Sequence, residues 1–144
     1  MSTSSPSLSG PTGLPGLDRA WLGYGQALWS QPHLPALVLE RCRQRLLQLH
    51  GAPQRGSFLG PGPDPVPRTF AETPGEALQA CLDFAELYAQ DPEQLTDAQA
   101  EAVKSHFGEE GLVVLIQALG LFDAQCRLEL WSRSQPATPR EGQP

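Results

Sequence analysis

Three residues in one short stretch, Glu40, Cys42 and His50, have the side-chain types that thiol chemistry uses. A thiolate is the reactive form of cysteine, and a nearby histidine or glutamate can take up the proton that the thiol releases. Cys42 and His50 lie eight residues apart. In one helix this is about 12 Å along the axis, too far for a hydrogen bond. We therefore expect an ion pair for Glu40, core packing for Cys42 and a helix-end cation for His50.

The remaining residues that could do chemistry give no stronger signal. Cys81 and Cys126 lie on apolar stripes, where a free thiol behaves as a small hydrophobic side chain. Three widely spaced cysteines do not suggest a disulfide framework, and reduced thiols fit a cytoplasmic protein. No Cys or His pair has the spacing of structural zinc ligands, and no glycine-rich loop follows a strand. We expect neither a metal nor a cofactor.

The charge and composition exclude several classes of partner. Sixteen acidic against ten basic side chains give a net charge of −6, opposite to the charge that nucleic acid binding requires. The N-terminus has neither the basic start nor the apolar core of a secretory signal. The most apolar run, 112–122, has 11 residues. It is shorter than the roughly 18–20 that a bilayer requires. We expect no nucleic acid and no membrane partner.

Helical periodicity and capping signals predict an all-α bundle of about five helices, without strands. Gly51 is placed to end the second helix, and Gly108 to separate the fourth from the fifth. Residues that can cap or open a helix place the five helices at Asp18 to Ser30, Pro35 to His50, Thr73 to Gln90, Thr96 to Gly108, and from Glu109 onward.

Segments rich in proline and glycine indicate where the domain begins and ends and where it contains a loop. Residues 1–16 and 135–144 are predicted to be disordered tails, and 52–70 is a Pro/Gly-rich loop within a single domain that spans 17–134. The run 112–122 is apolar or glycine at every position except Gln117, which is more than one helix face. The fifth helix is therefore predicted to lie at or just behind a subunit contact.

The stretch from Leu82 to Leu130 contains an ordered set of short motifs. They are FAE in one helix, then DP, LTD, HF and an EE pair, and finally an apolar helix that ends in Cys126-Arg127-Leu128. In order and spacing the stretch resembles the C-terminal half of the alkylhydroperoxidase AhpD-like family, also called carboxymuconolactone decarboxylase-like. That family has asparagine where this chain has Cys126. The segment 21–51 resembles the helix that leads into the family's redox site.

The resemblance implies a helical bundle, assembly into trimers or larger oligomers and, in active members, a thiol peroxidase site. That site is a Cys-x-x-Cys-x-x-x-His stretch with a glutamate ahead of it. Counted from Gly51, the two cysteine positions are Ala52 and Arg55 and the histidine position is Leu59, so that only Glu40 matches. The implied protein is one that has lost the redox site.

Function is accordingly predicted as a non-catalytic, self-associating scaffold or interaction module, a dimer, trimer or hexamer. The alternative is an enzyme: a thiol-dependent, peroxiredoxin-type peroxidase that uses Cys42, Cys81 or Cys126, or a carboxymuconolactone decarboxylase-like enzyme that needs no thiol. A third reading is a ligand-binding module with a pocket under the 52–70 loop. A solvent-reaching cleft beside Glu40 that holds a cysteine or histidine favours the enzyme, and packed apolar contacts favour the scaffold.

Overall fold

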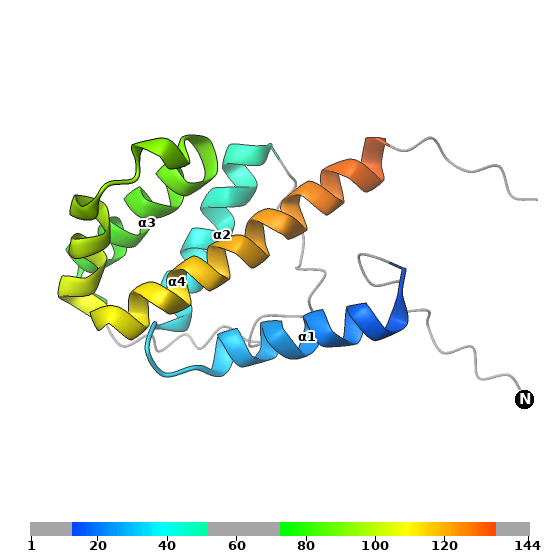
Figure 1. Cartoon of the computed structure of the whole chain (residues 1–144), viewed down its shortest axis with the longest axis horizontal. Helices are drawn as coiled ribbons and strands as arrows, with labels where there is room; N and C mark the ends of the chain where they lie inside the picture. The colour runs from blue at the N-terminus through cyan, green and yellow to red at the C-terminus, as the bar shows by residue number, and fades with distance from the viewer. Residues whose placement is uncertain (1–12, 52–72, 135–144) are drawn as a thin grey trace, which may run out of the picture.

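The computed structural model describes residues 13–51 and 73–134, and this part of the chain is all helix and connections, without a strand. In chain order the elements are α1 (Pro15–Ser30), α2 (Ala36–His50), α3 (Gly75–Gln90), the 3₁₀ turn η1 (Pro92–Gln94) and α4 (Asp97–Ser134). α2, α3 and α4 pack on one another, and α1 lies along α4 (Figure 1). The predicted all-α fold is confirmed.

Gly108 divides α4 into two helices. Its backbone has φ 74° and ψ 179°, far from helical values, so the chain changes direction between Phe107 and Glu109 (Figure 1). Only glycine adopts such angles readily, since it has no Cβ. The two parts are the predicted fourth and fifth helices, and the predicted break at Gly108 is confirmed.

Local signals at other helix ends are confirmed in part. Gly51 takes the left-handed conformation, φ 65°, and ends α2. At the predicted helix start, Thr96, the backbone N–H donates to Gln99 Oε1 over 2.8 Å, which is the glutamine half of a capping box. α1, however, begins at Pro15, so Asp18 lies in its first turn and is not the cap. Pro74 caps α3 in place of Thr73.

The core lies between α2, α3 and the second part of α4. Its largest fully enclosed side chains are leucines and small apolar residues from these helices, with Leu34 ahead of α2 and Val103 from the first part of α4. On α2 the predicted core packing of Cys42 is confirmed, since it is fully buried together with Leu39 and Leu46. On α3 the buried residues are Ala77, Cys81, Phe84 and Ala85. His106, in the first part of α4, is exposed.

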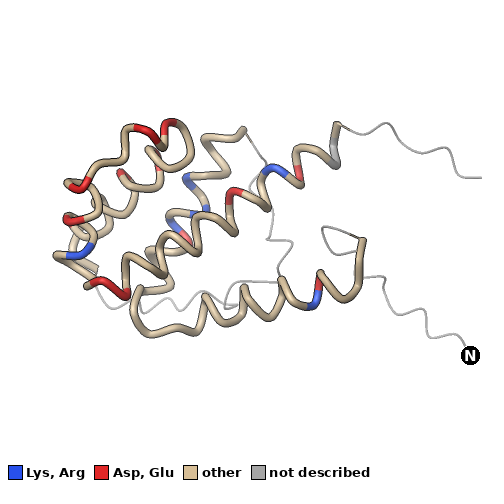
Figure 2. Tube along the Cα trace, in the orientation of Figure 1, with Lys and Arg blue, Asp and Glu red and all other residues tan. Residues whose placement is uncertain are grey.

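Charges of opposite sign meet within the fold. Acidic residues gather on α3 and the first part of α4, whereas basic residues lie on α2 (Figure 2). Arg45 of α2 donates from Nε to Glu86 Oε1 of α3 over 2.7 Å. Both side chains are more than a third exposed, so this pair adds little to stability.

Most of the predicted tails and loop cannot be compared with the structure, because residues 1–12, the whole 52–70 loop and all of 135–144 lie outside the described residues. Pro15 and Gly16, at the end of the predicted N-terminal tail, belong to α1.

Candidate functional site

Glu40 is held by side chains of its own helix. Arg43 donates to both carboxylate oxygens, from Nε over 2.8 Å and from Nη2 over 2.6 Å, and Gln44 donates over 3.1 Å. The two charged side chains are about five-sixths buried, at 15% and 16% exposure. An i,i+3 pair of this kind stabilises a helix, and the hydrogen bonds from Arg43 and Gln44 occupy both carboxylate oxygens.

Cys42 lies in the core and does not reach solvent. Its exposure is 0%, as is that of Cys81 on α3. Burial raises the pKa of the Cys42 thiol far above its ordinary value, and the proximity of Cys81 raises it further. Burial also raises the pKa of Cys81 to about 12. Both sulfurs are therefore neutral thiols at physiological pH and pack as small apolar groups.

His50, in the last turn of α2, contacts α4. Its Nε2 lies 2.7 Å from Oδ1 of Asp123, and the other carboxylate oxygen, Oδ2, accepts a hydrogen bond of 2.8 Å from Nε of Arg127. His50 and Asp123 are mostly buried, at 16% and 18% exposure, while Arg127 is 67% exposed. This His50–Asp123–Arg127 cluster fastens the end of α2 to α4.

The structure does not bring the three sequence candidates together. Glu40 bonds to Arg43 and Gln44, Cys42 packs in the core, and His50 bonds to Asp123. A histidine paired with an aspartate is two-thirds of a hydrolytic triad. Within residues 13–51 and 73–134, however, no thiol or hydroxyl is hydrogen-bonded to His50.

Sequence reasoning missed Asp123. The available signal was a single carboxylate placed directly after the apolar run 112–122 and four residues before an arginine. A charged residue on a helix that is apolar nearly all round needs a partner. The periodicity of α4 does not show that this partner comes from α2.

Metal binding has no geometric basis in the described segments. No group of three or more His, Cys, Asp and Glu side chains there could hold an ion.

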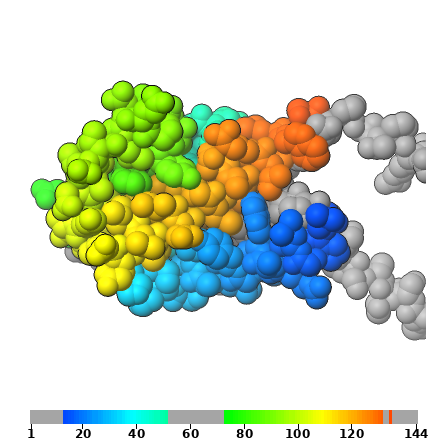
Figure 3. All heavy atoms as spheres, viewed as in Figure 1, coloured from blue at the N-terminus to red at the C-terminus, as the bar shows by residue number. Residues whose placement is uncertain are grey.

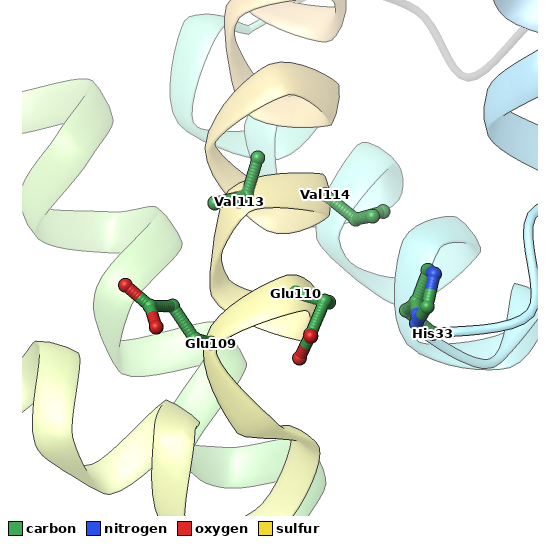
Figure 4. A pocket seen from close by; sticks show the side chains of 5 residues that line it. All are labelled: His33, Glu109, Glu110, Val113 and Val114. Carbon is green, nitrogen blue, oxygen red and sulfur yellow. The ribbon is translucent and has the colours of Figure 1, made fainter.

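Two surface hollows lie beside α4. One, of about 430 Å³, is lined by His33, Glu109, Glu110, Val113 and Val114; Glu110 and Val114 project to the side of His33 and Glu109 to the opposite side (Figure 4). The other, of about 420 Å³, lies between α1 and α4 and is lined mainly by apolar side chains: Trp21, Tyr24, Ile116, Gln117, Gly120, Leu121 and Ala124. Neither hollow contains a cysteine.

By length and composition alone, one described helix could cross a membrane. It is the α4 stretch Asp97–Trp131, and half of its most apolar window is buried inside the fold. This is weak evidence for a membrane span, because the core helix of a bundle meets the same criterion.

The fold and these contacts define a small helical bundle with buried thiols. Compared with known protein families, curated proteins and solved structures, the chain gives no match in any of the three comparisons. The AhpD-like resemblance therefore remains a prediction from the sequence.

Replacing Asp123 with alanine is expected to lower the free energy of unfolding by about 1–3 kcal/mol, because His50 then loses a largely buried charged acceptor. Urea unfolding followed by circular dichroism measures the change. The matched control is Arg127→Ala, which removes only the exposed partner and is expected to cost at most about 0.5 kcal/mol. Equal effects of the two substitutions would show that the contact between α2 and α4 contributes nothing beyond the local pair.

Proposed function

We propose that this protein is a non-catalytic, AhpD-like helical module of the cytoplasm that associates with copies of itself through the outer face of α4. The observation that carries the proposal is the exposure of Val113 and Ile116, which are 53% and 44% accessible in the middle of the most apolar helix. They adjoin the two hollows beside α4. Apolar surface gathered in one place on a small protein commonly marks an interface.

The state of the thiols supports a non-catalytic role. Peroxidase chemistry requires a thiolate that peroxide can reach. Cys42, Cys81 and Cys126 are all buried, and burial raises the pKa of each thiol. Glu40, the one residue that matches the redox-site pattern of the AhpD-like family, is bonded to Arg43. These contacts are those of a packed scaffold.

Burial separates the residues of the apolar run that a partner could reach from those that it could not. Leu115 and Leu119 point inward and are 0% exposed, so charged substitutions there would disrupt the core and would not test association. Val113, Ile116 and Gln117 are the exposed members of the run. The proposed contact therefore uses the outer face of α4 and not its leucines.

At micromolar concentration, light scattering is expected to give a mass of twice 15.6 kDa or a higher multiple. Ile116→Glu is expected to shift the protein to the monomer, because a buried unpaired carboxylate opposes the contact. The control is Ala102→Glu, which adds the same charge at an exposed position before the Gly108 break. A wild-type mass of 15.6 kDa would refute self-association, and an oligomer that survives Ile116→Glu would place the contact elsewhere.

A further inference from the structure

The outer face of α4 carries a straight line of six residues, here named the α4 stripe: Glu109, Val113, Ile116, Gly120, Ala124 and Arg127. From Glu109 to Arg127 the five intervals between successive members span 18 residues, so the mean interval is 3.6 residues. This is the number of residues in one turn of an α-helix. Such a line runs parallel to the helix axis over about 27 Å. α4 lies at the molecular surface between α3 and α1, and its outer side is open in this view (Figure 3).

We propose that two copies of this chain pair along the α4 stripe in antiparallel orientation, about a two-fold axis that passes close to Ala118. The inference rests on the proposed self-association and specifies its partner and geometry. In such a pair, residues whose numbers add to about 236 or 237 lie opposite each other.

Charge complementarity selects the antiparallel direction. The stripe begins with an acid, Glu109, and ends with a base, Arg127, and both are exposed. An antiparallel pair places Glu109 of each copy opposite Arg127 of the other, so that both ends attract. A parallel pair would place like charges together at both ends and would align the helix dipoles unfavourably. Arg127 keeps donors for this contact, because only its Nε is bonded to Asp123.

Side-chain size is complementary in the same arrangement. Val113 faces Ala124, and Ile116 faces Gly120, so that each large side chain meets a small one. Gly120, Ala124, Trp21 and Tyr24 line the hollow of about 420 Å³ between α1 and α4. Ile116 of the second copy would enter this hollow. A self-complementary patch of this kind is what a two-fold interface requires.

The fold itself does not require a glycine at position 120. A Cβ there would approach the Tyr88 hydroxyl at 3.5 Å, an ordinary contact, and the residue is in the middle of a helix, where glycine is unfavourable. A missing side chain lets two helix axes approach closely. Gln117 beside it adds no unpaired amide oxygen, because that oxygen accepts from the Tyr24 hydroxyl.

The two paired α4 helices must cross at a small angle. At the +20° crossing angle of left-handed pairs, the ends of the two stripes, each about 27 Å long, stay close enough for their side chains to touch. At a −50° crossing angle, the ends of the two helices would be about one helix diameter apart. The pair therefore resembles one antiparallel segment of a helical bundle.

Cysteine cross-linking tests the direction of the pair. The three native cysteines are buried, so the wild-type protein is the background control. With copper phenanthroline as oxidant, Gly120→Cys is expected to give a disulfide-linked dimer, since position 120 lies near the axis. Val113→Cys alone is expected to give none, because the two copies of position 113 are about 16 Å apart along the axis. Val113→Cys combined with Ala124→Cys is expected to restore the cross-link.

Exchanging charges provides an independent test that does not depend on a new thiol. Glu109→Lys and Arg127→Glu should each weaken the homodimer roughly tenfold, through repulsion at two ends. An equimolar mixture of the two variants should restore wild-type affinity, because every end of the heterodimer then pairs opposite charges. Sedimentation equilibrium measures all three, with circular dichroism to establish that each variant is folded.

The outcomes separate the two proposals. A monomeric wild-type protein overturns both self-association and the antiparallel pair. An oligomer in which Val113→Cys alone cross-links, or in which neither charge variant weakens association, leaves self-association standing and overturns the antiparallel pairing along α4.

Discussion

Replacing Gly108 with alanine is expected to lower the free energy of unfolding by about 1–3 kcal/mol. The residue has φ 74° and ψ 179°, a region that is essentially confined to glycine, so that a Cβ imposes backbone strain. A variant that relieves this strain must redirect the first part of α4, where Val103 is fully buried. Urea unfolding, followed by circular dichroism at 222 nm, measures the loss.

The control for this substitution is Gly23→Ala. Gly23 is an exposed residue inside α1, with helical φ, and a Cβ there would meet nothing within 4 Å. Its replacement is expected to raise stability by about 0.5–1 kcal/mol, since alanine favours the helix. If Gly108→Ala proved as stable as the wild type, α4 would have to tolerate a continuous helix through this position, and the break would not be required by the fold.

The second large effect concerns the thiols. Burial, together with the charges of Asp123 and Glu129, raises the pKa of Cys126 to about 11, and Arg43 and Arg127 partly offset the rise. At pH 8 only about one Cys126 sulfur in a thousand is then a thiolate, roughly 240-fold fewer than for an ordinary cysteine of pKa about 8.5. Iodoacetamide should therefore alkylate the folded protein at least 100-fold more slowly than the protein in urea, as measured by intact mass.

The pH dependence has a definite sign. Because the pKa of the thiol is raised, the neutral form predominates below about pH 11, and the alkylation rate of Cys126 should increase about tenfold per pH unit between pH 7 and 10 while the fold persists. A control variant, Gly23→Cys, places a thiol at an exposed position and should react rapidly at pH 8.

The low reactivity of the buried thiols can also be tested by measuring peroxidase activity. With a dithiol donor, the protein is expected to show no rate above that of a variant in which Cys42, Cys81 and Cys126 are all serine. A rate that one Cys→Ser substitution abolishes would contradict the non-catalytic proposal and restore the peroxidase alternative.

The features that the sequence predicted correctly are mostly local. Gly51, Gly108 and the Thr96–Gln99 capping contact depend on backbone conformation and on residues three apart. The Glu40–Arg43 pair is local in the same way. The predicted start of α1 was wrong, because both Asp18 and Pro15 suit a helix N-terminus. The helix begins at Pro15, about one turn before the predicted start.

The features that the sequence did not predict depend on how the helices pack. His50 and Asp123 are 73 residues apart, and neither the α2 nor the α4 periodicity indicates that they meet. Likewise, the excess of apolar residues in 112–122 predicted an exposed face without showing which residues form it. Packing of α4 on α2 and α3 buries Leu115 and Leu119 and leaves Val113 and Ile116 outside.

The position of α1 has a consequence for the order in which the fold opens. Of its residues only Gly25 and Leu28 are buried, and it is held to α4 by the tilted Trp29–Phe122 ring pair, with centroids 6.0 Å apart, and by the Tyr24–Gln117 hydrogen bond. Because α1 adds only these few contacts and Leu28 to the core, we expect it to detach at a lower free energy than the packed α2, α3 and α4. Its detachment would enlarge the apolar surface around Ile116 without global unfolding.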